Sequence, residues 1–415
     1  MRQRDTSERA TAMAMATGNG APVPGEIDRL LVQQYDISRA VTIGGIDTCI
    51  RGLLEYAPPG VELAIVGVDD RSTSDHELGR WETHVRGGHT VHFLPVARFD
   101  TSRPHRRIPH SVRLVAGLVR HRAAIPRPKL VQAHRLDVAM AVRLLFRAPL
   151  VYCVHTQEHG LIGRTSDSFW RFAGGSLYAR LDRMMARVAR RVIVFNPDYA
   201  ERIRGWNPHT VSAPTWFDPA TTPFRPESPN PYAVVWVGRL EVPKDPMLAV
   251  DTFAELARAH PDEPWTLDIV GSGTLRPDLE RRIAELPAQV ADRITLLGRL
   301  SPRQLAEVRG RSGVFLMTSH PGYEGFPRVL VEALATGLPS VVTEGSDTGR
   351  LVRPQLSGSV HGRDPRSLAE GIRAARELDR AQVAGVVARL SAPEVVREVF
   401  FGDDTRFATT GGGRV

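Results

Sequence analysis

Seven residues separate two glutamates, Glu324 and Glu332, in the stretch PGYEGFPRVLVEALATGLPSVVT. Glu324 follows the apolar run GVFLMTS and is predicted to lie in a loop, whereas Glu332 is predicted to lie in the helix that comes next. Carboxylates accept hydrogen bonds from hydroxyl groups, and the free N–H groups of a helix N-terminus attract a phosphate. The spacing therefore suits two polyol groups, one on each side of a diphosphate.

The helix that carries Glu332 is expected to begin with Pro327 at its first position and to end at Gly337. Its predicted buried face is the apolar set at helical spacing, Val329, Leu330, Ala333 and Leu334. Glu332 lies off that face. A purely structural alternative pairs Glu332 with Arg328 one turn earlier and makes Glu324 a surface charge of the loop.

Glycines and basic residues follow three other predicted strands in the second half of the chain. They are Gly238, Arg239 and Lys244 after the first strand, Gly271 and Gly273 after the next, and Gly298 and Arg299 after the third. Glycine allows a backbone to approach a ligand closely, and Arg or Lys beside it supplies positive charge for a diphosphate. These residues are expected to gather around the same phosphate groups as the helix N-terminus.

Together these motifs resemble the E-x7-E signature of retaining GT-B glycosyltransferases of the GT4-type family, the glycosyl transferases group 1. The resemblance covers VGRLEVPKDP, the GSG turn, LLGRLSPRQLAEVRGRSGVFLMTS and SGSVHGRDPRSLAEGI. It implies that Glu324 contacts the donor sugar, that Glu332 holds the ribose, and that Arg239 and Lys244 stabilise the leaving diphosphate. Pro327 stands where many members carry glycine, which removes one N–H donor to the phosphate.

The resemblance implies a wider donor-binding set and a catalytic histidine in the first half. TIGGIDT resembles the glycine loop near the donor phosphates, and KLVQAHRLD resembles a strand end with an active-site histidine, so His134 joins the catalytic set. His155, in VYCVHTQE, is a second candidate outside that set. The predicted donor-binding residues are Gly44, Gly45, Gly238, Gly273, Arg299, Gly325, Phe326, Arg328, Val329 and Glu332.

The reaction implied is transfer of a sugar from a UDP- or GDP-sugar to a hydroxyl of a glycan, glycolipid or small-molecule acceptor, with retention. Front-face attack is expected, in which a donor phosphate oxygen takes the acceptor proton. No metal is expected to be required. No cofactor is expected either, because the nucleotide sugar is itself a substrate. Asp69 and Asp70, in GVDDRS, are expected to lie in a solvated loop rather than to bind a metal.

Short apolar runs separated by amphipathic stretches predict an α/β fold. The predicted strands are 30–36, 61–68, 129–134, 148–155 and 190–196 in the first half, and 233–240, 265–273, 293–300, 313–319 and 339–344 in the second. The fold class expected is GT-B, two Rossmann-like doubly wound domains facing a central cleft. The domains are predicted as 28–217 for the acceptor and 218–384 for the donor.

The remaining segments and the composition complete the expected organisation. Residues 1–27 are predicted to be a disordered lead-in, 385–403 a C-terminal helix returning to the first domain, and 404–415 a flexible tail. The 415 residues include only two cysteines, without ligand-like spacing, which favours a reducing cytoplasm. No apolar run is long enough to cross a bilayer.

The net charge is +8, and no acidic residue occurs from Thr101 to Leu136. The basic stretch 103–129 is a candidate contact for an anionic membrane, with Val112, Val115, Leu118 and Val119 on one face. The same apolar positions would equally suit a helix that faces the core. Three alternatives remain: a GT-B-like epimerase or hydrolase, an inactive sugar-nucleotide binder, and a basic nucleic-acid-binding protein. No nucleic-acid partner is expected, because no helix-turn-helix, zinc-finger or aromatic RNA-binding signature is present.

Overall fold

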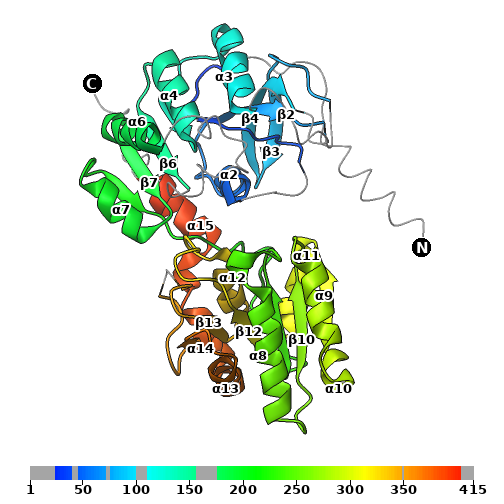
Figure 1. Cartoon of the computed structure of the whole chain (residues 1–415). Helices are drawn as coiled ribbons and strands as arrows, with labels where there is room; N and C mark the ends of the chain where they lie inside the picture. Colours follow the sequence, from blue (N-terminus) through cyan, green and yellow to red (C-terminus); the bar gives the residue numbers. More distant parts are fainter. Residues whose placement is uncertain are drawn as a thin grey trace. The chain divides into compact units, whose positions relative to one another are not determined.

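The computed structural model describes residues 24–39, 45–71, 75–99, 110–155, 175–347 and 350–402. The chain forms two compact units. The first unit runs to Ala213 and includes a segment that begins at Val396, and the second unit is Pro214–Val395. Figure 1 shows a sheet with helices packed on it in each unit. The predicted lead-in up to residue 23, the tail 404–415 and Gly44 lie outside the described residues.

The sheet of the first unit has the strand order β3-β4-β2-β1-β5-β6-β7-β8, and β3 with β4 is its antiparallel pair. Its strands are β1 Arg29–Val32, β2 Leu63–Asp69, β3 Glu82–Arg86, β4 His89–Arg98, β5 Leu130–Ala133, β6 Leu150–Val154, β7 Arg191–Val194 and β8 Thr210–Ser212. The α-helices are α2 Gly45–Glu55, α3 His110–Arg120, α4 Leu136–Leu145, α6 Gly175–Val188 and α7 Pro197–Arg204.

The sheet of the second unit is wholly parallel, with the order β11-β10-β9-β12-β13-β14. Its strands are β9 Ala233–Val237, β10 Thr266–Val270, β11 Ile294–Gly298, β12 Val314–Met317, β13 Ser340–Thr343 and β14 Gly358–His361. Its longer helices are α8 Pro246–Ala259, α9 Arg276–Ala284, α11 Pro302–Arg311, α12 Arg328–Thr336 and α13 Pro365–Ala375, and its shorter ones are α10 Ala288–Ala291, α14 Arg380–Gly385 and α15 Ala392–Val395.

Burial on both faces of the sheet explains why the central parallel strands are apolar. All seven residues of β2 are buried, and so are all four of β12, because helices cover both faces of a doubly wound sheet. Each strand predicted from the sequence is present, and the predicted α/β class is confirmed. The β3–β4 hairpin was not predicted, because β3 alternates half-buried and exposed residues at the sheet edge and carries a weak apolar signal.

The order of strands places a ligand-binding crevice in each unit by a general rule. In the second unit the chain builds outward from β9 in one direction to β11, then returns to the other side of β9 with β12. Open α/β sheets bind ligands outside the carboxyl ends of the strands at such a reversal. The crevice expected here lies after β9 and β12. In the first unit, the equivalent reversal is between β1 and β5.

The predicted C-terminal helix 385–403 is divided into several short pieces. A 3₁₀ turn, Ala388–Leu390, precedes α15, and a π-helical turn, Val396–Phe400, follows it. This last turn packs in the first unit, where the Nη2 of Arg29 donates a 2.7 Å hydrogen bond to the carbonyl of Phe400. The guanidinium of Arg29 also stacks over the ring of Phe401, 4.2 Å from its centre.

Helix α3 carries residues 110–120 of the basic stretch. Leu114 and Leu118 are fully buried against the core, whereas Val112 is 42% exposed and Val119 is 55% exposed. The helix therefore packs on one stripe and leaves a second apolar stripe outside. Among the described helices, none combines the length and the apolar composition that crossing a bilayer would need.

Candidate functional site

The loop after β12 and the turn after β9 meet through an ion pair. The Nζ of Lys244 lies 2.5 Å from the Oε1 of Glu324, and the two side chains are 14% and 10% exposed. Lys244 ends a 3₁₀ turn, Val242–Lys244, that follows β9, and Glu324 lies in the loop between β12 and α12. Two residues 80 positions apart in the sequence thus come together at the predicted crevice.

Glu324 has a second partner that holds the same carboxylate oxygen. The hydroxyl of Ser319 donates a 2.7 Å hydrogen bond to its Oε1. Ser319 is fully buried, and its carbonyl accepts a 2.6 Å hydrogen bond from the hydroxyl of Thr343 at the end of β13. Because one oxygen receives both donors, the carboxylate is oriented by the protein. Its other oxygen accepts no hydrogen bond from the described residues.

Glu332 is held by a buried arginine from another helix. The Nη1 of Arg309, on α11, lies 2.5 Å from the Oε2 of Glu332, and the arginine side chain is only 4% exposed. The alternative partner predicted from the sequence, Arg328, instead lies over the ring of Trp216. The Nε of Arg309 is buried without a hydrogen-bond partner in the described residues. Keeping this guanidinium out of water is costly, so the glutamate beside it is a required counter-charge.

The start of α12 differs by one position from the prediction. Pro327 is the N-cap, and the helix begins at Arg328, because the ψ of Pro327 is 103° and therefore extended. The helix ends as predicted at Gly337, whose φ of 88° suits glycine. Its buried residues include Leu330, Ala333 and Leu334, as predicted, while Val329 is only partly buried.

The turns that carry the strand-end glycines pack tightly against one another. A Cβ on Gly271 would lie 1.8 Å from the carbonyl oxygen of Gly238, and one on Gly273 would lie 2.3 Å from that of Leu240. The backbone N–H of Leu240 donates to the carbonyl of Ser272. These glycines therefore serve contact between two turns, a role that their sequence positions did not reveal.

Two predicted cations lie on the surface beside these turns. Arg239 is exposed and donates a hydrogen bond to the hydroxyl of Tyr323, whose ring also lies 5.7 Å from the Nζ of Lys244. Arg299 is exposed directly after β11. In the loop before α12, Gly325 is exposed and Phe326 packs partly on the core. The predicted donor-binding residues of the second unit therefore lie on the turns after β9, β10, β11 and β12 and in α12.

In the first unit, His134 directly follows β5 and is buried. It is 2% exposed, and both ring nitrogens are engaged: the Nε2 with the amide of Gln132 at 2.8 Å, and the Nδ1 with the Nε2 of His155 at 2.7 Å. Burial lowers the pKa of His134 well below its usual value, and the nearby His155 and Arg29 lower it further. His155, after β6, is the partly exposed ring of the pair. Gly45, also in the predicted set, is the first residue of α2.

Cys49, on α2, completes a cluster with the two histidines. Its Sγ and the ring nitrogens of His134 and His155 all lie within 4.8 Å of one another. The sequence offered no ligand-like spacing for this cysteine, and only the fold brings it to the histidines. Thiolate and imidazole are both ligands for zinc, but here the facing nitrogens of the histidines already share a hydrogen bond.

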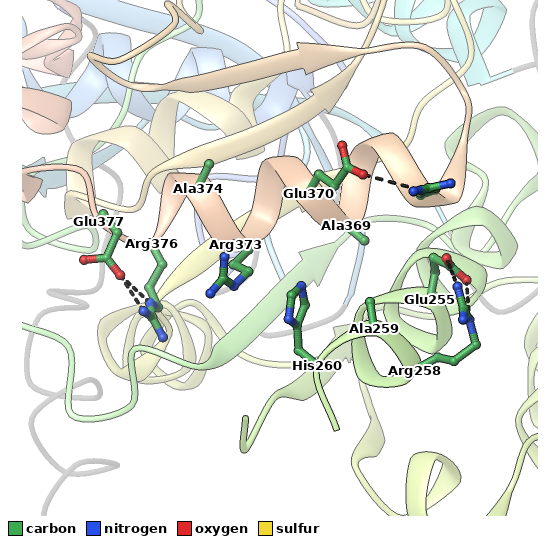
Figure 2. A pocket seen from close by; sticks show the side chains of 11 residues that line it. Glu255, Arg258, Ala259, His260, Ala369, Glu370, Arg373, Ala374, Arg376 and Glu377 are labelled. Carbon is green, nitrogen blue, oxygen red and sulfur yellow. Dashed lines mark hydrogen bonds and ion pairs between the residues drawn. The ribbon is translucent and has the colours of Figure 1, made fainter. Parts of the chain in front are cut away.

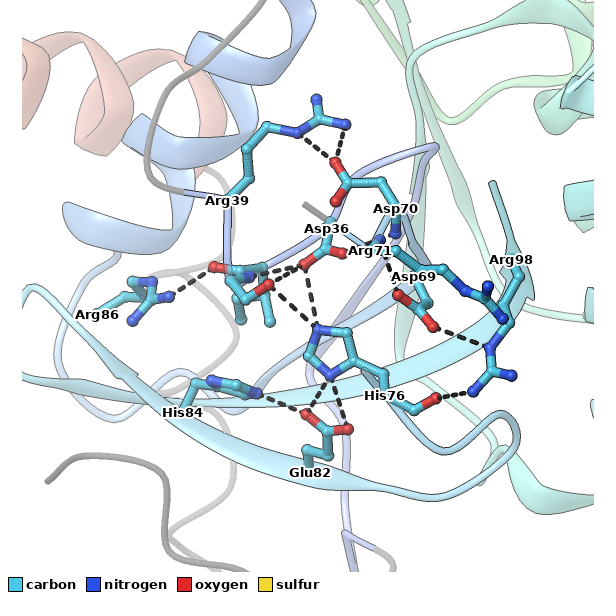
Figure 3. A network of polar contacts seen from close by, with 12 residues as sticks. Asp36, Arg39, Asp69, Asp70, Arg71, His76, Glu82, His84, Arg86 and Arg98 are labelled. Atoms are coloured by element: carbon cyan, nitrogen blue, oxygen red, sulfur yellow. Dashed lines mark hydrogen bonds and ion pairs between the residues drawn. The ribbon is translucent and has the colours of Figure 1, made fainter. Parts of the chain in front are cut away.

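Asp69 and Asp70 do not lie in the solvated loop that the sequence predicted. Asp69 ends β2 and is fully buried, and Asp70 is 3% exposed. Figure 3 shows the reason: Arg98 donates to Asp69 at 3.0 Å and Arg39 donates to Asp70. The prediction was wrong because the two arginines come from other parts of the fold, Arg98 from the end of β4 and Arg39 from the segment after β1, so their compensation of the aspartates is a tertiary effect.

The same network encloses a histidine between two carboxylates. The Nε2 of His76 lies 3.2 Å from Asp36, and its Nδ1 lies 2.9 Å from Glu82, which also contacts His84. Burial favours the neutral ring, but hydrogen bonds and charges of Asp36 and Glu82 prevail and raise the pKa of His76 to about 10. Burial likewise opposes ionisation of Glu82, yet His76 and His84 lower its pKa to about 2. His76 is therefore a structural cation.

A hollow between α8 and α13, shown in Figure 2, contains none of the predicted site residues. It lies at the C-terminal end of α8, about 20 Å along the helix from Lys244. Its rim is made of paired charges, such as Arg258 with Glu255 and Arg376 with Glu377, both at 2.5 Å. Since its charges are already paired and it lies at the amino ends of the strands, it is no rival to the site after β9 and β12.

Three residues that orient the predicted ones were not predicted from the sequence: Arg309, Gln132 and Arg29. Arg309 had a signal, because it lies four residues after Leu305 on the apolar stripe of α11. Gln132 also had one, as a polar residue inside an apolar strand. Arg29, at the start of a strand, had none.

The chain is similar to known proteins in sequence and in fold. Residues 231–377 match the family described as glycosyl transferases group 1. A glycogen synthase of Mycobacterium tuberculosis is 27% identical over 260 residues, which is 60% of each chain. A D-inositol 3-phosphate glycosyltransferase of Segniliparus rotundus is 28% identical over 343 residues, or 76% of this chain and 72% of that protein. The chain thus spans less than two thirds of the glycogen synthase.

Solved structures share the fold over nearly the whole chain. A sucrose-phosphate synthase from Thermosynechococcus elongatus has a TM-score of 0.66 at 18% identity, covering 93% of this chain and 100% of that one. Anabaena HepE in complex with UDP-glucose has a TM-score of 0.61 at 17% identity, covering 91% and 99%. Two Rossmann-like domains of the GT-B kind are therefore confirmed as the fold.

The pair of Arg309 with Glu332 predicts a large loss of stability for Arg309→Met. The methionine fills the space of the stem but leaves the glutamate without its counter-charge, so we expect the free energy of unfolding to fall by about 3 kcal/mol. Urea unfolding measures this value. The control is Arg311→Met on the same helix, which breaks a half-exposed pair with Asp268 and should cost less than about 1 kcal/mol. Equal losses in both variants would contradict the assignment.

The environment of His76 predicts a window of pH in which the network stabilises the first unit most. The raised pKa of His76 contributes stability that is complete below about pH 6.5 and is lost as the pH rises toward 10. The lowered pKa of Glu82 contributes stability that is complete above about pH 4.5 and is lost as the pH falls toward 2. The difference in unfolding free energy between wild type and His76→Gln should therefore peak between pH 4.5 and 6.5. Urea unfolding across pH tests this, and a flat difference would refute it.

Proposed function

Because the second unit belongs to the glycosyl transferases group 1 family, we propose that this chain is a glycosyltransferase that acts on a nucleoside diphosphate sugar. The sugar passes to a hydroxyl of a glycan, glycolipid or small-molecule acceptor, and its anomeric configuration is retained. The observation that carries the proposal is the placement of Glu324 and Glu332. Each is held by a cation from another element beside the strand ends where this fold class binds ligands.

In this proposal the two glutamates bind the two ends of the donor. Glu332 accepts hydrogen bonds from the ribose through Oε1, since Arg309 occupies its Oε2. Glu324 accepts from sugar hydroxyls through its free oxygen, since Lys244 and Ser319 occupy the other. Both carboxylates are oriented before a ligand arrives, which lowers the entropy cost of binding.

Positive charge between the glutamates stabilises the leaving diphosphate. Lys244 and Arg239 lie on the turn after β9, and the N-terminus of α12 supplies further N–H groups and a favourable dipole. The bond between the anomeric carbon and the diphosphate oxygen breaks, the acceptor oxygen bonds to that carbon from the same face, and a phosphate oxygen takes the acceptor proton. The protein's part is orientation and charge stabilisation.

In the first unit we assign the substrate contact to His155 and place His134 behind it. His134, the catalytic histidine predicted from the sequence, is buried with both nitrogens engaged, whereas His155 is partly exposed. Gly45, the first residue of α2, belongs to the proposed phosphate-binding segment. No nucleic-acid-binding signature in the sequence favours the alternative of a basic binding protein.

The donor proposal predicts magnesium-independent binding of one nucleoside diphosphate that depends on Glu332. We expect calorimetric titration with UDP, GDP, ADP and dTDP to single out one nucleotide, with UDP tested first because HepE was solved with UDP-glucose. Loss of the ribose hydrogen bonds in Glu332→Ala should weaken binding about tenfold to a hundredfold.

The matched control for that titration is Glu307→Ala, which removes an exposed glutamate that pairs with Arg303 on α11. It should bind the nucleotide as tightly as wild type. Failure of all four nucleotides to bind, or equal binding by Glu332→Ala, would refute the donor site.

We also propose that α3 contacts an anionic membrane surface where a lipid-linked acceptor would lie. Its exposed stripe contains Val112 and Val119, with Arg113 and Arg120 next to them in the sequence, and the basic stretch begins before the described helix. Apolar side chains flanked by arginines suit the boundary between headgroups and acyl chains.

This membrane proposal predicts sedimentation with phosphatidylglycerol vesicles but not with phosphatidylcholine vesicles. Replacing Val112 and Val119 by serine should reduce the bound fraction severalfold, because it removes apolar area from the stripe. Leu144→Ser is the control, since Leu144 is an 86% exposed leucine on α4. Equal binding by both variants, or none by wild type at low salt, would refute the proposal.

A further inference from the structure

A line of buried polar side chains runs from the start of β1 to the partly exposed His155. Arg29, Gln132 and His134 are each at most 2% exposed. Successive hydrogen bonds join the Nη1 of Arg29 to the Oε1 of Gln132 at 2.8 Å, the Nε2 of Gln132 to the Nε2 of His134 at 2.8 Å, and the Nδ1 of His134 to the Nε2 of His155 at 2.7 Å. These residues come from three adjacent strands, β1, β5 and β6.

The direction of every hydrogen bond in this line follows from its first member. A guanidinium only donates, so the amide of Gln132 must turn its oxygen toward Arg29 and its NH2 toward His134. The NH2 group also only donates, so the Nε2 of His134 must be the acceptor and carry no proton. In a neutral ring the proton is then on Nδ1, which donates to the Nε2 of His155.

The ring of His134 is held neutral by its surroundings. Burial lowers the pKa of His134 well below the ordinary value, and the positive charge of Arg29 acts in the same direction. The Nε2 of His155 is thereby an acceptor as well, so its proton is on Nδ1. The ring of His155 is also held in place by stacking on Phe195, with centres 4.3 Å apart.

We propose that Arg29 and Gln132 are positioning residues that fix the tautomer of His134 and, through it, present His155 to the substrate with an N–H donor at Nδ1. The activity part of this inference rests on the proposed glycosyltransferase function, but the tautomer part does not. The donor at Nδ1 is suited to a sugar hydroxyl or a phosphate oxygen, which are both acceptors.

The C-terminal turn closes this arrangement. The carbonyl of Phe400 accepts a hydrogen bond from the Nη2 of Arg29. The ring centre of Phe400 lies 6.2 Å from the ring centre of Phe195, which stacks on His155. One segment therefore contacts Arg29 at one end of the line and lies near the ring that stacks on His155 at the other.

The test is the protonation of His134 in the full-length protein, read by long-range 1H–15N NMR of the histidine rings. Signals are assigned with His134→Gln and His155→Gln. In wild type, we expect His134 to have an unprotonated Nε2 and a protonated Nδ1. In Gln132→Glu, a carboxylate replaces the NH2 donor, so the Nε2 of His134 must gain a proton.

Two further variants separate this effect from loss of stability. Gln33→Glu puts the same substitution at another buried glutamine, 4% exposed, directly after β1, and should leave the His134 signals unchanged. Arg29→Lys keeps a group that only donates, so the wild-type tautomer should persist. If Gln132→Glu fails to fold, the wild-type spectrum together with Arg29→Lys still decides the tautomer.

Sugar transfer provides the second reading. We expect Gln132→Glu to lower kcat about tenfold to a hundredfold while the dissociation constant of the nucleoside diphosphate is unchanged. If Gln132→Glu binds the nucleotide and keeps the wild-type kcat, the link to catalysis is refuted. If the wild type binds no nucleotide, the proposed function is refuted, but the NMR result on the tautomer still stands.

Two results would overturn the tautomer itself. One is a protonated Nε2 on His134 in wild type. The other is one tightly bound zinc ion per chain in the purified protein, lost together in variants of Cys49, His134 and His155, because those atoms are close enough to be ligands after small shifts.

Discussion

Charged and polar side chains that are removed from water need partners, and this requirement shapes every functional feature of the protein. Burying an ionised group without compensation costs several kcal/mol, so each such group constrains the position of another. Arg309 constrains Glu332, Lys244 constrains Glu324, and Arg29 constrains Gln132. The partners come from different strands and helices, so the packing of the sheets and the geometry of the sites depend on one another.

The two sheets use this requirement in different ways. At the carboxyl ends of β9 and β12, ion pairs leave one oxygen of each glutamate available for hydroxyl groups. After β5 and β6, hydrogen bonds between obligate donors and acceptors set the protonation of a histidine pair. The first arrangement suits binding of a polyol diphosphate, and the second suits donation of one hydrogen bond in a fixed direction.

The network around His76 shows the same principle with a purely structural result. Asp36 and Glu82 surround a buried histidine and hold it charged, because their charges outweigh its loss of hydration. Its pKa lies far from neutrality, so it does not switch under physiological conditions. The raised pKa of His76 therefore indicates a compensated charge in the core. The lowered pKa of His134 belongs instead to a ring that contacts the partly exposed His155.

The sequence by itself determined the α/β class, the main strands and the glutamate pair of the second unit, because these depend on local apolar periodicity and on a motif within one short segment. It also predicted the end of α12 at Gly337, since glycine is the residue that most readily adopts the positive φ of a helix end. Only the tertiary structure decided what holds each glutamate, that Asp69 and Asp70 are buried, and that His134 lies behind His155. Those features join residues from separate strands, and the direction of a hydrogen bond between them depends on the partner that folding brings into contact.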